Sequence, residues 1–187
     1  GNWSFDSIKK QLIFGMPLII GLWAYQGLNF IGKYFLEILS NLENVGLYTV
    51  GTTLASAPLF LVLGFKQLWS PIFYENMNNK DYEIISKLIT YFTVIISLLC
   101  LILTLFSKEI IISLLDKEFH LIIPIISFLL LATFFNGLLT ISNTFLSFNN
   151  DFSKISFFAL IATISNINLN VLLIPNYGIL GASISLM

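Results

Sequence analysis

The chain has 187 residues, of which 57% are hydrophobic and 10% are charged, and its formal net charge at pH 7 is −1. A soluble domain of this length would carry about a quarter charged residues, so the composition excludes an ordinary soluble domain. All nine basic residues are Lys, which removes the bidentate Arg clamps of phosphate-binding surfaces. The net charge and the lack of a long basic cluster indicate no nucleic-acid partner.

Long uncharged stretches dominate the sequence. Five of them contain no Lys, Asp or Glu, at 11–32, 44–65, 88–107, 119–150 and 155–187. An α-helix needs about 20 apolar residues to cross roughly 30 Å of hydrocarbon. Lipid offers backbone N–H and C=O groups no partner, so such stretches should be helical. The sequence therefore predicts an integral membrane protein.

The fold class that follows is all-α, a polytopic transmembrane helix bundle with five complete spans and the start of a sixth. The last apolar run has nine residues, which rise only about 14 Å at 1.5 Å per residue, so we expect the chain to be a fragment cut within its sixth span. In chain order, the predicted spans are about 11–33, 45–69, 88–106, 121–148, 155–175 and 179–187.

Small and polar residues predict close contacts between some of these helices. In the second span, Gly51 and Ala55 form a small-xxx-small pair, which lets a neighbouring backbone approach closely. In the fifth span, Asn166 and Asn170 are four residues apart and share a face, whereas Asn168 points elsewhere. The two aligned amides predict hydrogen bonds between helices.

Two connections have recognisable patterns. Residues 76–87 are polar and predict an inner loop that leads into the third span, with Asp81 as a candidate N-cap. Residues 108–120 carry apolar side chains at helical spacing, which predicts a helix lying along the outer membrane surface.

Lysine positions predict the orientation, since cytoplasmic loops of membrane proteins are enriched in basic residues. Aromatic residues near the span ends, Trp69 among them, are interpreted as interfacial anchors. With a cytoplasmic N-terminus, the outer side holds Lys33, Lys108 and Lys117, and the inner side holds Lys9, Lys10, Lys66, Lys80, Lys87 and Lys154.

Four segments carry a family resemblance: 33–36 (KYFL), 44–51 (NVGLYTVG), 69–75 (WSPIFYE) and 170–182 (NVLLIPNYGILGA). In this order and spacing they resemble the C-terminal half of bacterial polysaccharide repeat-unit flippases, which serve O-antigen or capsule synthesis. These flippases belong to the multidrug, oligosaccharidyl-lipid and polysaccharide exporter superfamily. The resemblance covers nearly the whole chain.

The resemblance implies a parent protein of twelve helices in two lobes, of which this chain would be the second. It implies alternating access, in which the two lobes rock around a central cavity, and an N-terminal lobe as partner. The implied cargo is an undecaprenyl-diphosphate-linked oligosaccharide, moved across the bacterial inner membrane among its lipids. Many relatives carry Asp-Arg before the Tyr-Phe-Leu element, but this chain has Gly32-Lys33, so any role of that acid does not transfer.

Two lysines are the charged candidates for cargo binding. Lys33 would attract the anionic diphosphate of the lipid carrier if it lines the cavity. Its alternative role is an ordinary anchor that snorkels to the outer headgroups. Lys66 would meet the headgroup on the cytoplasmic side, and its alternative is a positive-inside anchor.

Uncharged polar side chains in the spans have two interpretations as well. Gln26 and Asn29 are three residues apart and share a face, so they would either bind sugar hydroxyls or bond to a neighbouring helix. Tyr25 would stack on a sugar ring or face lipid. Asn136 and Thr140 in the fourth span are interpreted as contacts between helices.

Motifs for catalysis or cofactor binding are missing from the sequence. It contains no G-x-x-x-x-G-K-[ST] loop, no G-x-G-x-x-G, no H-E-x-x-H and no second cysteine beside Cys100. We therefore expect no enzymatic activity, no catalytic residue, no cofactor and no metal, and we interpret Cys100 as an apolar filler.

Several other functions remain open alongside the flippase. A cation-coupled multidrug extruder of the same superfamily typically uses an acid within the membrane, and the predicted spans contain none. A lipid II flippase is a sibling that sequence separates poorly. A membrane polymerase or ligase would be expected to carry a substantial outer loop, and a non-transporting scaffold would have no hydrated cavity.

Overall fold

The protein is a bundle of long helices in the computed structural model. The model describes the backbone of residues 5–187, and the described side chains begin at Gly15 and omit positions 17, 18, 20, 22, 25 and 29. Over the described backbone there is no strand. The helices are α1 (Phe5–Leu39), α2 (Leu42–Ala55), α3 (Leu59–Asn79), α4 (Tyr82–Leu105), α5 (Ser107–Leu114), the 3-10 helix η1 (Lys117–Ile122), α6 (Ile123–Phe148), α7 (Phe152–Tyr177) and α8 (Ile179–Leu186).

Three helical segments are long and apolar enough to cross a membrane: α4, α7 and the continuous stretch Lys117–Phe148 of η1 and α6. The bent pair of α2 and α3 makes a fourth if it is counted as one span. The all-helical, membrane-spanning class is therefore confirmed. The predicted total of five complete spans stays a prediction, because α1 and the eight-residue α8 are not in this set.

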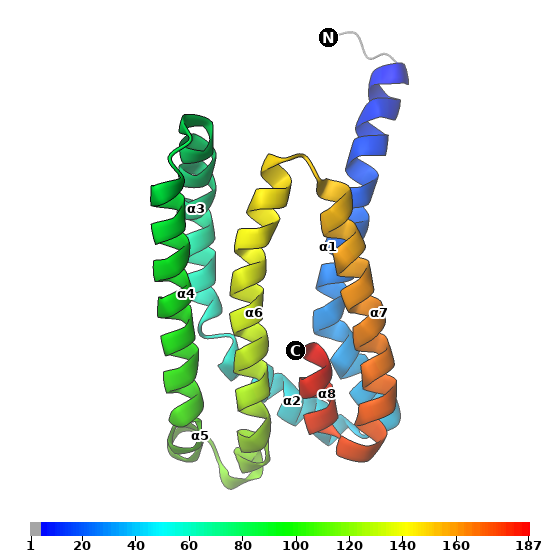
Figure 1. Ribbon diagram of the computed structural model, residues 1–187. Helices are drawn as coiled ribbons and strands as arrows, with labels where there is room; N and C mark the ends of the chain where they lie inside the picture. The colour runs from blue at the N-terminus through cyan, green and yellow to red at the C-terminus, as the bar shows by residue number, and fades with distance from the viewer. Residues whose placement is uncertain (1–4) are drawn as a thin grey trace.

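The helices form two groups that meet at one end (Figure 1). The α4 group consists of α3, α4 and α6, and the α1 group consists of α1, α7 and α8. The short α2 packs against members of both groups, and α8 packs against α6. Within the described residues, α3 makes no contact with α1 or α7. The two groups are thus joined through α2 and α8 at one end and by the α6–α7 contact and its short loop at the other, while α1 and α3 lie apart toward the end where the N-terminus lies (Figure 1).

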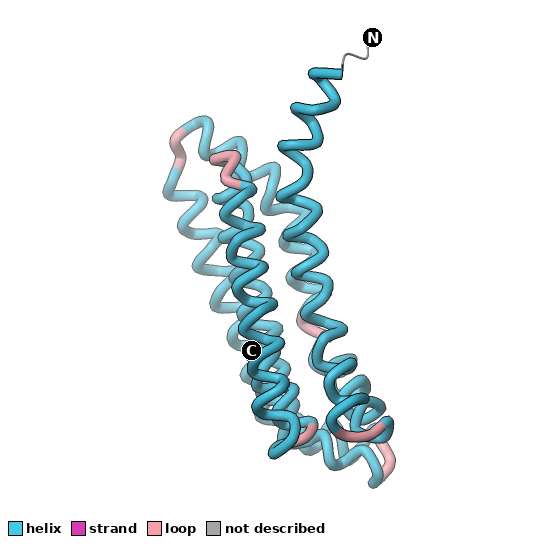
Figure 2. Tube along the Cα trace, turned by 90° about the vertical axis from the view of Figure 1, so that its right-hand side faces the viewer, coloured by secondary structure: helices cyan, strands magenta, loops and turns pink. Residues whose placement is uncertain are grey.

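The second predicted span is divided in two. Residues 56–58 form a turn between α2 and α3, and the axes of the two helices differ by 47°. Pro58 has no N–H to continue an α-helical ladder, and the Leu59 N–H donates to Ser56 O instead of Ala55 O. Figure 2 shows that this break lies partway along the bundle, whereas the other loops gather at its ends.

The inner loop predicted at 76–87 is wrong in its extent. The helix α3 continues to Asn79, and α4 begins at Tyr82, so only Lys80 and Asp81 connect them. Lys80 adopts a left-handed conformation with φ of 60° and ends α3. The N-cap role of Asp81 is confirmed, since its carboxylate accepts the Ile84 N–H at 3.4 Å.

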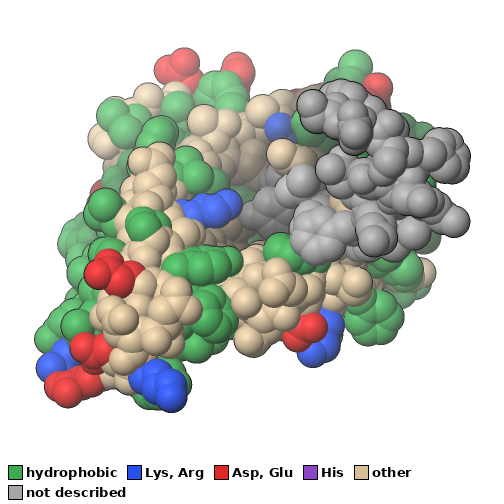
Figure 3. Space-filling view, turned by 90° about the horizontal axis from the view of Figure 1, so that it is seen from above, with side chains coloured by type: hydrophobic (Ala, Val, Ile, Leu, Met, Phe, Trp, Pro, Cys, Tyr) green, Lys and Arg blue, Asp and Glu red, His purple; other side chains and the backbone are tan. Residues whose placement is uncertain are grey.

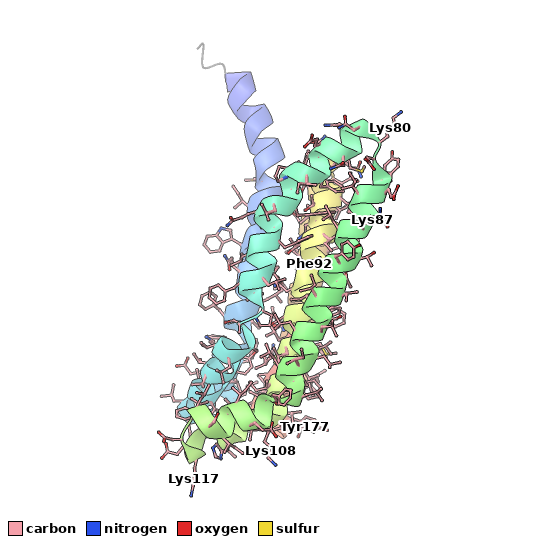
Figure 4. All side chains as sticks on the ribbon, turned by 90° about the vertical axis from the view of Figure 1, so that its left-hand side faces the viewer. Lys80, Lys87, Phe92, Lys108, Lys117 and Tyr177 are labelled. Carbon is pink, nitrogen blue, oxygen red and sulfur yellow. The ribbon has the colours of Figure 1, made fainter. Side chains whose placement is uncertain are left out.

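The connection at 108–120 is helical, as its spacing predicts, because α5 and η1 occupy most of it. Its place on a membrane surface stays a prediction. The predicted distribution of lysines is confirmed in part: Lys80 and Lys87 lie at one end of the bundle and Lys108 and Lys117 at the other (Figure 4). Which end faces the cytoplasm stays a prediction.

Close packing of α2 on α6 holds the broken helix in place. A Cβ on Gly51 would lie 3.1 Å from Ile125 Cδ1 and 3.3 Å from Leu129 Cδ1, so the predicted close approach at Gly51 and Ala55 is confirmed. The Thr133 hydroxyl of α6 lies 2.9 Å from Ala55 O and 3.1 Å from Leu129 O, and its one proton is shared between them. Thr133 therefore supplies the donor that the break denies to Ala55 O.

We predict that Thr133→Val destabilises the protein. The substitution keeps the shape but leaves a buried carbonyl unpaired at the break, which costs about 1–3 kcal/mol. The midpoint of thermal unfolding in detergent should fall. Thr90→Val is the matched control, because the Thr90 hydroxyl is exposed and donates only to Ser86 O of its own helix. Equal midpoints for the two variants would contradict this role of Thr133.

A buried polar cluster joins α7 to α8. The Asn166 amide donates to Ser185 O at 2.6 Å, the Ser185 hydroxyl donates to Asn170 Oδ1 at 2.8 Å, and the Asn170 amide donates to Asn166 O at 2.8 Å. Asn168, on the other face, is exposed and donates to Ile164 O. The predicted role of the aligned amides in helix contacts is confirmed.

The turn from α7 to α8 depends on two glycines. Gly178 has φ of 54°, a conformation that favours glycine. At Gly181 a Cβ would lie 2.6 Å from both Leu173 C and Leu173 O, and 2.9 Å from Ile174 N. These are main-chain atoms of α7, so α8 can pack at this distance only with glycine.

We predict that Gly181→Ala forces α7 and α8 apart and destabilises the protein by about 1–3 kcal/mol, as overpacking does. Gly46→Ala is the control, since a Cβ there meets nothing within 4 Å and Ala is the better helix former by about 1 kcal/mol. The unfolding midpoint in detergent should fall for the first variant and stay or rise for the second. A fall of similar size in both would remove the packing explanation.

Trp69 is not an interfacial anchor, and that interpretation is wrong. Its side chain is 1% exposed and packs with Phe65 and Phe73, with ring centroids 5.4 and 5.1 Å apart. Phe65 in turn stacks on Phe92 of α4 at 3.8 Å. These aromatic rings form the core of the α4 group. Cys100 is buried beside this core, as predicted.

Candidate substrate-binding site

The surface is hollowed at the end where the two helix groups diverge. Seen from above, in Figure 3, this hollow lies between the two sides of the bundle, and lysine side chains border it while acidic side chains lie toward the rim. We call this depression the central hollow. Its floor is formed where α2 and α8 pack against α6.

On the α1 side, the predicted residues Gln26, Asn29 and Lys33 recur at i, i+3 and i+7, which places them on one face of α1. Gln26 is exposed and Lys33 is half-buried. The side chains of Asn29 and Tyr25 lie outside the described residues. Lys33 lies six residues before the end of α1, so it is closer to the floor of the bundle than Gln26 is.

On the α3 side, Lys66 shares the helix face that buries Val62 and Trp69, which are 3% and 1% exposed. Lys66 is nevertheless exposed. Its neighbour Phe65 stacks on Phe92 of α4, and successive helical side chains differ in direction by about 100°. Lys66 therefore points about 100° away from the direction of Phe65, at the exposed edge of the buried face of α3.

Neither lysine has a carboxylate partner among the described side chains. The two ion pairs there join Lys87 to Glu83 and Lys154 to Asp151, each at 2.6 Å and each within the first turn or two of a helix. Lys33 and Lys66 come from helices that make no contact with each other. Like Lys80, Lys108 and Lys117, both lysines have no ion pair among the described side chains, and they lie on different helix groups.

The α6 helix contributes polar residues that the sequence interpretation did not assign to binding. Asn136, Thr140, Asn143 and Ser147 follow i, i+4, i+7 and i+11 spacing, and each is half-buried. Both Asn136 and Thr140 are predicted to bridge helices; Thr140 instead donates to Asn136 O within α6 at 3.3 Å, whereas the role of the Asn136 side chain stays a prediction. The spacing itself was a usable signal, since four polar residues in an apolar span share one face.

The described residues hold no group of three or more His, Cys, Asp or Glu side chains that could bind a metal ion. No described Asp or Glu lies in the middle of α4, α6 or α7. The helices around the hollow carry lysine, amide and hydroxyl side chains among the described residues.

Comparisons with known proteins add no family. A scan against protein-family models found no match, and searches of curated proteins and of solved structures found none.

We predict that the hollow is hydrated. In a Cys100→Ala background, Lys66→Cys should react with a membrane-impermeant maleimide, because thiols ionise and react only where water reaches them. Leu68→Cys is the control: Leu68 is 67% exposed but lies on the opposite side of α3, where the protein would face lipid. Labelling of Lys66→Cys should be at least several-fold faster. Equal labelling of the two would show that the hollow is dry.

Proposed function

We propose that this protein is one lobe of a flippase that moves an undecaprenyl-diphosphate-linked oligosaccharide across the bacterial inner membrane by alternating access. The family resemblance in the sequence suggests this function. The observation that carries the proposal is that Lys33 and Lys66, which lie within long apolar helices, have no carboxylate partner among the described side chains. A charge left unneutralised within an apolar bundle is costly and marks a functional site.

The chemistry of such a cargo matches the hollow in three respects. Its diphosphate is anionic and would be attracted to lysine as a point charge. Its sugars carry hydroxyls that amides such as Gln26 can bind, and Asn29 and Tyr25 remain candidates for the same contact. Its lipid tail would stay in the bilayer. A hollow that is open on one side of the α4 group would let the tail extend from the bound headgroup into the lipid.

The architecture is also suited to rocking. Two helix groups diverge around the hollow and meet through α2 and α8. Rigid-body rocking of bundles around a central site is the usual form of alternating access. We propose that an N-terminal lobe of the same parent protein completes the cavity.

A cation-coupled multidrug extruder or a lipid II flippase is the second candidate. A cationic drug would be repelled by Lys33 and Lys66, which favours an anionic cargo over the extruder. Lipid II shares the diphosphate, so the charges alone do not separate it from the proposed cargo. A non-transporting scaffold gives no reason for unpaired lysines beside a hollow.

The direct experiment is reconstitution of the full-length parent protein in liposomes with fluorescently labelled, lipid-linked oligosaccharide. Labelled lipid that reaches the outside of the vesicle would be reduced by an added quencher, so the loss of fluorescence measures translocation. Lipid II and a cationic dye in parallel vesicles would distinguish the alternatives. Transport of the dye but not of either lipid-linked sugar would establish the extruder instead.

We predict that Lys33→Ala lowers the translocation rate about tenfold or more, because a hydrogen bond to a charged group contributes about 1.5–3 kcal/mol. Lys108→Ala is the control, since Lys108 is an exposed lysine at the end of the bundle opposite the central hollow (Figure 4). Both variants should reach normal protein levels. If Lys33→Ala complements a flippase-null strain as well as Lys108→Ala does, Lys33 is an anchor and not a cargo ligand.

A further inference from the structure

The buried apolar side chains of the described residues form two hydrophobic cores that have no buried residue in common. The lower core joins α2 and the first turns of α6 to α8 and the end of α1, and it includes Leu36, Leu47, Ala55, Ile125, Leu129 and Ile174. The upper core joins α3, α4 and the rest of α6, and it includes Val62, Trp69, Phe73, Phe92, Ile96 and Ile141. In Figure 1, α3 of the upper core lies above α2 and α8 of the lower core.

The chain passes between the two cores at one level of the bundle. The change of core falls within residues 130–134 of α6, 55–59 of the α2–α3 pair and 100–103 of α4. The hydrogen bond from Thr133 of α6 to Ala55 O places the first two of these crossings side by side. We call this level the junction.

At the junction, the α2–α3 pair is not continuous as a helix. The Leu59 N–H donates to Ser56 O, and the Phe60 N–H donates to Ala57 O at 3.3 Å. Among the described backbone groups, no N–H of α3 donates to a carbonyl of α2. The angle of 47° between the two helices therefore depends on the dihedral angles of residues 56–58 and not on a shared ladder of hydrogen bonds. Hinges in proteins are short segments of this kind between two elements.

Each core is closely packed next to the junction. On the lower side, Gly51 of α2 lies against Ile125 and Leu129 of α6. On the upper side, a Cβ on Gly137 of α6 would lie 3.4 Å from Val62 Cγ2 and 3.7 Å from a side-chain carbon of α4. Close-packed interiors deform little, so each core should move as one body.

The α6 helix runs through both cores, so it has to bend slightly if they move. The Thr133 hydroxyl lies at the junction, 3.1 Å from Leu129 O of the preceding turn. Such contacts between a hydroxyl and the backbone of its own helix often accompany a bend. The one continuous helix that joins α3 to the lower core through Thr133 is therefore suited to flexing at the same level as the break.

We propose that residues 56–58 are a hinge about which the upper core swings on the lower core. Because α1 and α3 make no contact among the described residues, packing between them does not oppose a swing of α3 toward or away from α1. The loop of residues 149–151, which joins α6 to α7, limits the swing. A swing of about 10° would move the far end of the 21-residue α3, about 30 Å from the hinge, by about 5 Å.

This inference goes beyond the proposed function and does not depend on the identity of a cargo. Rocking of two lobes leaves each lobe rigid, whereas this hinge divides a single lobe into two bodies. The swing changes the separation of α1 and α3, and with it the width of the central hollow.

The test measures distances between pairs of spin labels in the full-length protein in lipid nanodiscs, with Cys100 and any other native cysteine replaced. Leu68→Cys with Leu114→Cys crosses the junction, because Leu68 is on α3 and Leu114 is on α5, whose Ile111 belongs to the lower core. Leu68→Cys with Leu98→Cys is the control pair, since both helices belong to the upper core. All three labelled positions are exposed, by 67, 70 and 53% for Leu68, Leu114 and Leu98.

The pair across the junction should give a distance distribution that is broader than that of the control pair, or two maxima about 5 Å apart, as the swing of α3 implies. The control pair should give one narrow maximum. Equal widths for the two pairs would show that the two cores move as one body and would overturn the inference.

Pro58→Ala tests whether the movement depends on the break. It restores an N–H with which the helix can continue, so the distribution across the junction should become narrower. Pro71→Ala is the matched control, because Pro71 is exposed and lies inside α3, within the upper core. It should leave the distribution unchanged. Equal narrowing by both variants, or no narrowing by Pro58→Ala, would show that residues 56–58 are not the hinge. If Pro58→Ala does not fold, the comparison of the two label pairs in the protein with Pro58 still decides.

The outcomes separate this inference from the proposed function. If the protein moves no lipid-linked oligosaccharide but the two label pairs differ as expected, the proposed function fails and the hinge stands. If the protein moves this cargo and the two pairs have equal widths, the hinge fails and the proposed function stands.

Discussion

A carbonyl or N–H group inside hydrocarbon has no water to bond, so each one that leaves the helical ladder needs a partner from the protein. In this bundle, side chains of neighbouring helices supply some of those partners. Thr133 donates to Ala55 O where the second span breaks, and Asn166 donates to Ser185 O near the end of α8. The same bonds hold the helices in register.

Charged side chains are also costly in hydrocarbon, so they too need a partner or contact with water. Ion pairs such as Lys87 with Glu83 lie near helix ends, where both side chains are largely exposed. Lys33 and Lys66 lack such a partner in the described part of the chain, as Lys80, Lys108 and Lys117 do, but unlike those three they lie within long apolar helices. The other predicted spans contain almost no charge, so the presence of these two lysines calls for an explanation. Binding of an anionic cargo would explain them.

Much of the fold was predictable because hydropathy is a local property. The spans predicted at 88–106, 121–148 and 155–175 correspond to α4, α6 and α7 within a few residues. The errors arose where local and distant effects differ. Residues 76–79 are polar enough to suggest a loop but continue α3, and Trp69 resembles an interfacial anchor but is buried by rings from α4 and its own helix. The site was predictable in part: a charge such as Lys66 is visible in an apolar sequence, whereas the direction in which it projects from the bundle is not.

The amino-acid sequence by itself determined that the protein is helical and enters a membrane, because uncharged stretches of that length leave the backbone no other way to satisfy its hydrogen bonds. It also identified the polar and charged residues within apolar stretches, whose free-energy cost in hydrocarbon calls for a structural or functional explanation. Only the tertiary structure decided how those residues are used. Whether an amide bonds to another helix, as Asn166 does, or bonds within its own helix, as Asn168 does, depends on where neighbouring helices lie. That position is set by packing between distant segments, such as Gly51 on Ile125, which no local pattern encodes.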